Sequence, residues 1–172
     1  MTKFIIEHNN LQRSQIPDWR TWTLRSWEEI VPALQAVLKI LEVAGYSHKE
    51  RFAVHLSLEE ALVNAIKHGH KGDPSKEVQL RCHFTSDYFL AEVEDQGPGF
   101  RPEEVPDPFA PENQERPCGR GLLLMRNFMT WVRFNEAGNR VTLCRRRLGA
   151  NAKEIAPTPN QSLAVPELTF LR

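Results

Sequence analysis

Apolar and polar residues alternate along the chain with two different periods, which predicts a succession of strands and helices. Residues 19–25 alternate in the manner of a strand. Apolar residues then recur at helical spacing over residues 26–45 and 47–68. Ser26 and Ser47 are each followed three positions later by glutamate, a capping pattern that indicates the start of a helix. The second helix is apolar around most of its circumference, so we expect it to be central.

Beyond residue 77 the spacing changes to a period of two. Residues 77–84 and 89–95 predict two strands joined by a hairpin turn, and the parity of the second strand places Asp95 on its apolar face. A third helix and two final strands are predicted over residues 122–129, 131–135 and 140–146. This order of elements predicts an α+β fold, a two-layer sandwich in which a mixed, mostly antiparallel sheet carries helices on one face.

The length of 172 residues is typical of one domain with its own core. We place that domain at residues 1–148 and treat residues 149–172 as a C-terminal extension. Four large apolar side chains distinguish the extension from a polar tail: Leu163, Val165, Leu168 and Phe170. We therefore expect part of it to pack on the domain or to form an interface.

The charge balance argues against several classes of function. Lysine and arginine total 22, and aspartate and glutamate also total 22, so no net field attracts nucleic acid or an anionic membrane. The run Arg145–Arg147 is better explained as protection of a sheet edge than as a nucleic-acid patch. No apolar stretch approaches the ~18 residues of a membrane span, and no signal-type run follows Met1. We expect a cytoplasmic protein whose three cysteines are reduced.

Three polar motifs interrupt this regular pattern, and the first lies on the second predicted helix. Glu60, Asn64 and His68 follow one another at intervals of four residues and therefore share one side of the helix. Such a stripe can simply be the solvated face of an amphipathic helix. It can also face a ligand, with the carboxylate acting as a base and the amide oxygen as a ligand for Mg²⁺.

The second motif, residues 95–100, begins where the second strand of the hairpin ends. An unpaired carboxylate on an apolar face is costly, so Asp95 requires hydrogen-bond donors, and the edge of a nucleobase can supply one. Gly97 and Gly99 allow a tight turn and the close approach of a flat ligand. The alternative is an ordinary strand end followed by a Gly-Pro turn.

The third motif, Gly119-Arg120-Gly121, precedes the third helix. Backbone amides exposed in a glycine-rich turn and at a helix N-terminus form an anion site that suits phosphate. Arg120 can contact such a phosphate or point to water. Alone this short motif is also explained by a simple helix cap.

The order and spacing of the three motifs resemble the N, G1 and G2 boxes of the GHKL (Bergerat-fold) ATPase superfamily. The matching residues are 60–69, 95–100 and 119–122, and the resemblance extends over about residues 20–147. The short chain and the His68-Gly69 ending of the first box are most similar to the anti-sigma-factor serine/threonine kinases. The resemblance implies the Bergerat ATP-binding fold.

The resemblance also implies a role for each matching residue. Glu60 matches the general base, and Asn64 matches the residue that coordinates Mg²⁺ bridging the phosphates of ATP. His68 matches a position near the phosphates. Asp95 matches the carboxylate that accepts a hydrogen bond from the adenine amino group.

The glycines of the second and third boxes are implied to contact the nucleotide as well. Gly97 and Gly99 match positions that shape the adenine pocket, and Gly119 and Gly121 match those whose amides meet the phosphates. Residues 101–118 occupy the place of the ATP lid. Five of the six prolines that fall between residues 98 and 117 lie in this lid.

The resemblance thus implies an ATP- and Mg²⁺-dependent serine/threonine protein kinase. Its expected partners are a sigma factor, an anti-anti-sigma protein of the STAS type, or both, and a homodimer is expected only by analogy. A nucleotide-gated binding module without significant transfer chemistry is the alternative. The catalytic domain of a sensor histidine kinase would require its phospho-accepting histidine on a separate chain.

Overall fold

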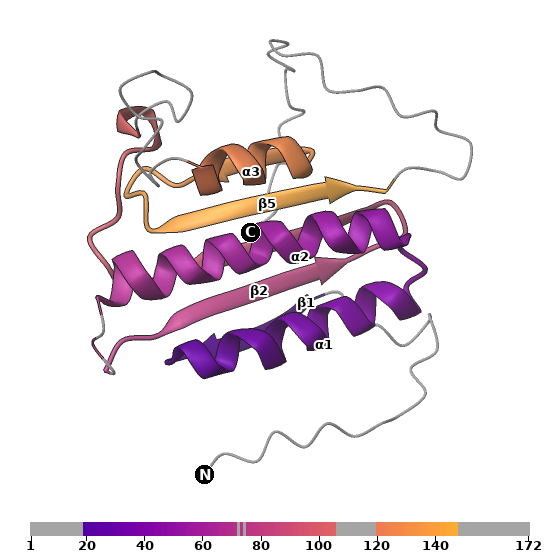
Figure 1. The fold of residues 1–172 in the computed structure, drawn as a ribbon, viewed down its shortest axis with the longest axis horizontal. Coiled ribbons are helices and arrows are strands. Elements are labelled where there is room, and N and C mark those ends of the chain that lie inside the picture. The colour runs from indigo at the N-terminus through magenta and orange to yellow at the C-terminus, as the bar shows by residue number, and fades with distance from the viewer. Residues whose placement is uncertain (1–18, 72, 74, 106–119, 148–172) are drawn as a thin grey trace, which may run out of the picture.

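A five-stranded antiparallel sheet forms one layer of the protein (Figure 1). The structure is a computed structural model that describes residues 19–71, 73, 75–105 and 120–147. The strands in chain order are β1 (Trp19–Leu24), β2 (Val78–Phe84), β3 (Tyr88–Glu94), β4 (Trp131–Phe134) and β5 (Arg140–Arg146). Their order across the sheet is β1-β2-β3-β5-β4, and each of these pairings is antiparallel.

Helices form the second layer and cover one face of the sheet (Figure 1). They are α1 (Ile30–Val43), α2 (His48–Asn64) and α3 (Arg120–Phe128). Helix α2 packs against both α1 and α3 and so occupies the centre of the layer. Three short turns complete the described elements: the 3-10 turns η2 (Trp27–Glu29) and η4 (Pro102–Glu104), and the π-helical turn η3 (Ala65–His70). The predicted α+β sandwich and the central second helix are confirmed.

The ends of the first two long helices follow from local sequence. Gly45 adopts a φ of +80°, which only glycine adopts without strain, and Tyr46 N–H donates to the Leu41 carbonyl at 2.9 Å to close α1. Ser47 then begins α2. The Ser47 N–H donates to the Glu50 carboxylate at 2.7 Å, and the Glu50 N–H donates to the Ser47 hydroxyl at 3.3 Å. The predicted capping box at this position is confirmed.

The core lies between α2 and the inner face of the sheet. The predicted alternation is confirmed on β2 and β3, where every second residue is buried. Burial raises the pKa of the Cys82 thiol well above its usual value and that of Cys144 to about 11. Both are free thiols, and Cys118 lies outside the described residues. The largest fully buried side chains include Leu24, Leu41, Leu58, Leu62, Leu80, Phe89 and Leu143.

The prediction that Arg145–Arg147 protect a sheet edge is wrong. Strand β5 is internal, because it pairs with β3 on one side and β4 on the other. Instead, Arg145 donates to the Phe128 carbonyl at the end of α3 at 2.9 Å. Arg147 donates to the Gly45 carbonyl just beyond α1 at 2.5 Å. These arginines therefore satisfy carbonyl groups at helix ends, which an arginine stabilises by charge and by hydrogen bonding.

Among the described residues, none of the helices has the length and apolar character needed to cross a bilayer. The terminal segments, including the predicted extension at residues 149–172, lie outside the described part of the chain.

The fold makes a direct prediction about stability. Leu41 on α1 is fully buried, so Leu41→Ala should lower the free energy of unfolding by about 2–5 kcal/mol through lost burial and the cavity left behind. Val31 on the same helix is 58% exposed, and Val31→Ala should change that free energy by no more than about 0.5 kcal/mol. Urea unfolding followed by circular dichroism measures both. Equal effects of the two variants would contradict the assignment of the core.

Candidate functional site

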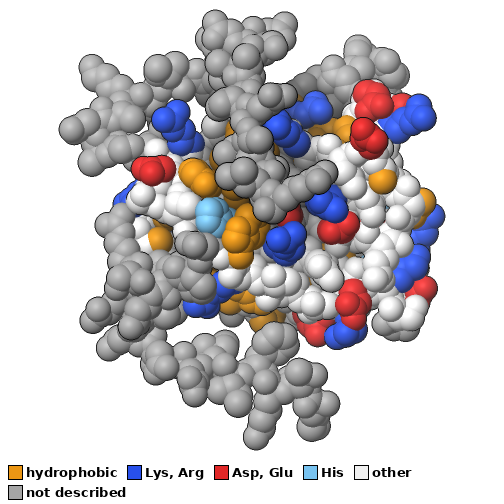
Figure 2. Space-filling view, turned by 180° about the vertical axis from the view of Figure 1, so that it is seen from behind, with side chains coloured by type: hydrophobic (Ala, Val, Ile, Leu, Met, Phe, Trp, Pro, Cys, Tyr) orange, Lys and Arg blue, Asp and Glu red, His pale blue; other side chains and the backbone are white. Residues whose placement is uncertain are grey.

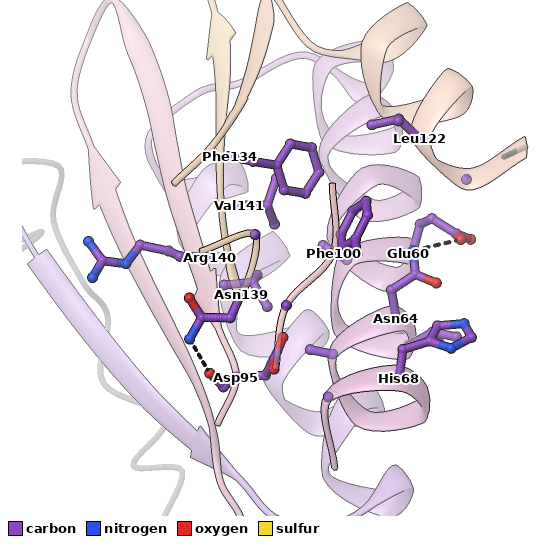
Figure 3. A pocket seen from close by; sticks show the side chains of 18 of the residues that line it. Glu60, Asn64, His68, Asp95, Phe100, Leu122, Phe134, Asn139, Arg140 and Val141 are labelled. Atoms are coloured by element: carbon purple, nitrogen blue, oxygen red, sulfur yellow. Dashed lines mark hydrogen bonds between the residues drawn. The ribbon is translucent and has the colours of Figure 1, made fainter. Parts of the chain in front are cut away.

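The acid, the amide and the imidazole of the first motif lie along one side of α2 and η3 (Figure 3). The Asn64 side-chain N–H donates to the Glu60 carboxylate at 3.0 Å. This bond holds the two side chains together and leaves the Asn64 amide oxygen as an acceptor for a further group. Glu60 and Asn64 are half-buried, whereas His68 is exposed.

The first turn of α3 lies directly against Glu60. A Cβ atom added to Gly121 would lie 1.8 Å from the nearer Glu60 carboxylate oxygen, so only glycine allows this approach. Arg120 is the first residue of α3 and has an exposed side chain, while Gly119 lies outside the described residues. The structure therefore brings a carboxylate next to a helix N-terminus, which is a site that favours an anion.

The π-helical turn η3 brings the backbone of Gly69, which has no side chain, into contact with Asp95. A Cβ atom added to Gly69 would lie 2.3 Å from the Asp95 carboxylate, and one added to Gly97 would lie 2.6 Å from the Gly69 Cα atom. The Gly97 N–H donates to the Asp95 carboxylate at 2.7 Å. The two glycines thus allow the end of β3 to pack against the end of the α2 segment.

Asp95 occupies a half-buried position, as its parity predicts. Burial raises the pKa of this carboxyl above its usual value, and the hydrogen bond from Gly97 and the nearby His70 act in the opposite direction. His70 is 2% exposed, and its Nε2 atom has no hydrogen-bond partner within the described residues. The carboxyl therefore lies in surroundings of low polarity, where a hydrogen bond to a ligand is strengthened.

The turn between β4 and β5 also positions Asp95, a role that was not predicted from the sequence. The Asp95 N–H donates to the Asn139 carbonyl at 2.9 Å, and the Asn139 side chain donates to the Asp95 carbonyl at 2.9 Å (Figure 3). Gly99 and Gly138 have φ angles of +73° and +72° and pack closely, with Phe100 N–H donating to the Gly138 carbonyl at 3.3 Å. The residues around Asn139 predict only an ordinary hairpin turn. The contact with Asp95 cannot be predicted from them, because Asp95 is distant in sequence.

These segments enclose a cavity of about 650 Å³, a size typical of small-molecule sites. Phe100 and Phe134 form an edge-to-face pair with ring centroids 5.1 Å apart. The apolar part of the wall includes Val93, Phe100, Val105, Leu122, Met125, Phe134 and Val141. The predicted site residues that line it are Glu60, Asn64, His68, Asp95, Gly99 and Gly121. Gly97 supports the wall by its contact with Gly69, which also lines the cavity.

The residues that line the cavity suit a ligand that has both an apolar group and an anionic group. Asp95 offers an acceptor beside the apolar walls, and Glu60 and Asn64 lie beside the N-terminus of α3 (Figure 3). Within the described residues, no group of three or more histidine, cysteine, aspartate and glutamate side chains could hold a metal. A metal in this cavity would therefore need ligand oxygens in addition to that of Asn64.

Comparisons with known proteins identify relatives of this chain. Serine-protein kinase RsbW from Bacillus licheniformis is 33% identical over 98 residues, which cover 52% of this chain and 59% of that protein. Serine-protein kinase RsbW from Listeria innocua is 27% identical over 124 residues, which cover 66% of this chain and 79% of that protein. The corresponding kinase from Bacillus subtilis is 30% identical over 106 residues, covering 58% and 66%.

A solved structure shares the fold. The crystal structure of the RsbU and RsbW domains of Rv1364c from Mycobacterium tuberculosis matches with a TM-score of 0.51 at 14% identity, covering 74% of this chain and 32% of that chain. The family model described as the histidine kinase-like ATPase domain matches residues 25–145. The resemblance of the three motifs to this superfamily is thereby confirmed, and the chain belongs to the histidine kinase-like ATPase domain family.

Proposed function

We propose that this protein is an ATP- and Mg²⁺-dependent serine/threonine protein kinase of the anti-sigma-factor type, which phosphorylates a hydroxyl group of a small regulatory partner. The observation that carries the proposal is the approach of Gly121, in the first turn of α3, to the Glu60 carboxylate. That approach supports the proposal because it brings the Glu60 carboxylate, the proposed base, beside a helix start, the proposed phosphate site. The similarity to three serine-protein kinases supports the same chemistry.

In the proposed orientation of ATP, the adenine lies at the Asp95 end of the cavity. The Asp95 carboxylate would accept a hydrogen bond from the adenine amino group, and Gly97 and Gly99 would allow the ring to approach the backbone. The apolar walls then bury the faces of the base. The phosphates extend toward α3, where Gly119, Arg120 and Gly121 would meet them and His68 lies at the cavity edge.

The proposed lid, residues 101–118, lies outside the described residues from position 106 onward. The described residues nearest to it on either side in the cavity wall are Val105 and Gly121. A lid at this position would exclude water from the transferred phosphoryl group and so favour transfer to a protein over hydrolysis.

The transfer step requires a base and a neutralised phosphate chain. Glu60 takes the proton of the attacking hydroxyl, whose oxygen forms a bond to the γ-phosphorus while the bond to the β–γ bridging oxygen breaks and ADP leaves. Asn64 would hold Mg²⁺ through its amide oxygen, since its N–H group is already bonded to Glu60. Bound Mg²⁺ supplies charge neutralisation between the phosphates.

The partner follows from the kinase branch that the chain resembles. We propose a sigma factor, an anti-anti-sigma protein of the STAS type, or both, in a cytoplasmic pathway that regulates transcription. By analogy with this branch we also propose a homodimer. Phosphorylation adds a charge of about −2 at the partner surface, which provides a means of release.

The role of Glu60 is tested by removing its carboxylate. Glu60→Ala should retain nucleotide binding but abolish transfer of label from [γ-³²P]ATP to a STAS-type partner. Glu59 is exposed and lies about 100° away on the helix, so Glu59→Ala serves as the matched control and should transfer normally. Phosphorylation of the partner by Glu60→Ala at the parental rate would contradict the mechanism. ATP binding by the parental protein without any label on the partner would favour a nucleotide-gated binder.

The role of Asp95 is tested by Asp95→Asn. The amide presents a donor as well as an acceptor, so the adenine amino group loses a charged acceptor in a buried site, and ATP affinity should fall by about tenfold or more. Isothermal titration calorimetry measures this change. The exposed Asp87 lies in the β2–β3 hairpin turn outside the cavity, and Asp87→Asn should bind ATP as the parent does. A normal affinity in Asp95→Asn would remove Asp95 from the binding site.

Gly121 allows a test that separates an effect on activity from an effect on stability. In Gly121→Ala the added methyl group occupies the space of the Glu60 carboxylate and must displace it, and a displacement of about 1 Å at a reacting group costs about 10²-fold in rate. Alanine is about 1 kcal/mol more favourable than glycine in a helix, which offsets any loss of stability. Phosphate transfer and urea unfolding, measured together, should show slow transfer in a folded protein. Unchanged transfer would contradict the importance of this approach.

A further inference from the structure

The face of the sheet that carries no described helix has one apolar row across all five strands. The strand register places the following residues side by side in the order of the strands: Trp19, His83, Leu90, Cys144 and Trp131. We call these five residues the outer row. Their parity is opposite to that of the buried residues of β2 and β3, so the row lies on the outer face.

The outer row differs from the rest of this face. The next rows on this face, toward the Asp95 end of the sheet, contain ion pairs between neighbouring strands. Arg81 pairs with Glu92 and Arg140 pairs with Glu94, each at 3.1 Å. In the outer row, by contrast, Trp19 is 42% exposed and stacks on His83 with ring centroids 4.9 Å apart. Figure 2 shows this side of the molecule, with hydrophobic side chains gathered around a histidine. Charged side chains are hydrated by water and need no other partner. The outer row, which is largely apolar, indicates a contact surface instead.

The chain leaves the sheet next to this row. Strand β5 continues two residues beyond Cys144, and Arg147 N–H still donates to the Asp87 carbonyl at 2.7 Å. Residues 148–172 therefore start from the end of the sheet at which the row lies. The nucleotide cavity lies at the other end, where β3 reaches Asp95 and β5 begins after Asn139.

The composition of the C-terminal segment matches the row. Residues 155–166 are twelve consecutive residues without a charged side chain, and apolar side chains continue through Leu168 and Phe170. The N-terminal segment, which precedes Trp19, is less suitable because it carries charges along its length at Lys3, Glu7, Arg13 and Asp18.

The C-terminal segment is also long enough. The row spans four gaps between strands of about 4.8 Å each, or about 19 Å. The sixteen residues from Arg147 to Leu163 can extend over about 50 Å. Leu163 and the apolar residues after it can therefore reach every position of the row.

We propose that residues 155–171 of this chain fold back over the outer row and bury it. The contact is intramolecular, occupies the sheet face at the end away from the nucleotide cavity, and withholds that face from a second copy. It does not rest on the proposed kinase activity, since none of the five residues lines the cavity.

Photo-crosslinking of the full chain tests the proposal. The change Leu163→p-benzoylphenylalanine places a photoreactive group in the segment, and an equal mixture of ¹⁴N- and ¹⁵N-labelled chains is irradiated at low concentration. Mass spectrometry should find crosslinks to the peptides of β2, β3 or β5 in products of a single isotope. Mixed-isotope products would assign the row to a second copy, and absence of crosslinks to the sheet would also overturn the proposal.

A second change tests whether the row itself is the contact. Leu90→Glu, added to the crosslinking chain, places a charge in the middle of the row and should abolish the crosslink. Val31→Glu, at an exposed position on α1, is the matched control and should leave it unchanged. The urea midpoint of each variant reports folding independently of nucleotide. A crosslink that persists in folded Leu90→Glu would exclude the row as the docking surface.

Discussion

The contact between the Asp95 carboxylate and the bare backbone of Gly69 and Gly97 is the constraint on which the rest of the site depends. It joins the helical layer to the sheet at the point where α2 has passed into η3 and β3 ends. A side chain at either glycine would separate the two layers, because its Cβ atom would overlap existing atoms. The position of the carboxylate is thus set by two layers of the fold, and Asn139 fixes its main chain from a third segment. Such a group is held in place before any ligand arrives, which lowers the cost of binding.

Helix α2 carries the core and the site on different sides. Leu58 and Leu62 are buried in the core, whereas the neighbouring Glu60 and Asn64 line the cavity. Because α1 and α3 flank this helix, its rotation is fixed, and the polar stripe can face only the cavity. The same packing brings α3 to Glu60, so the proposed base and the proposed phosphate site are positioned by one helix–helix contact. Binding groups on a rigid helix are held more accurately than groups on loops.

Local periodicity predicted the helices, the strands and the face on which Asp95 lies, because these features depend on residues close in sequence. The stripe of Glu60, Asn64 and His68 was likewise visible as a helical repeat. The role of Asn139 was not predictable, since its bonds to Asp95 join residues 44 positions apart. The arginines at the end of β5 were misread for a similar reason: sequence shows a charged strand end, but not that the strand is internal or that helix ends lie beside it. The π-helical turn also depends on tertiary contact, in that Gly69 packs against a strand from elsewhere in the chain.

The two ends of the sheet carry different kinds of surface, and strand β3 connects them. Leu90 lies in the outer row and Asp95 lies in the cavity, five residues or about 17 Å apart along an extended chain. Strand β3 is bonded along both sides, to β2 and β5, so it is among the least deformable parts of the sheet. A contact formed or released at the outer row would therefore move the Asp95 end of the cavity little. For this reason the row is better suited to control association of the protein than to control its affinity for nucleotide.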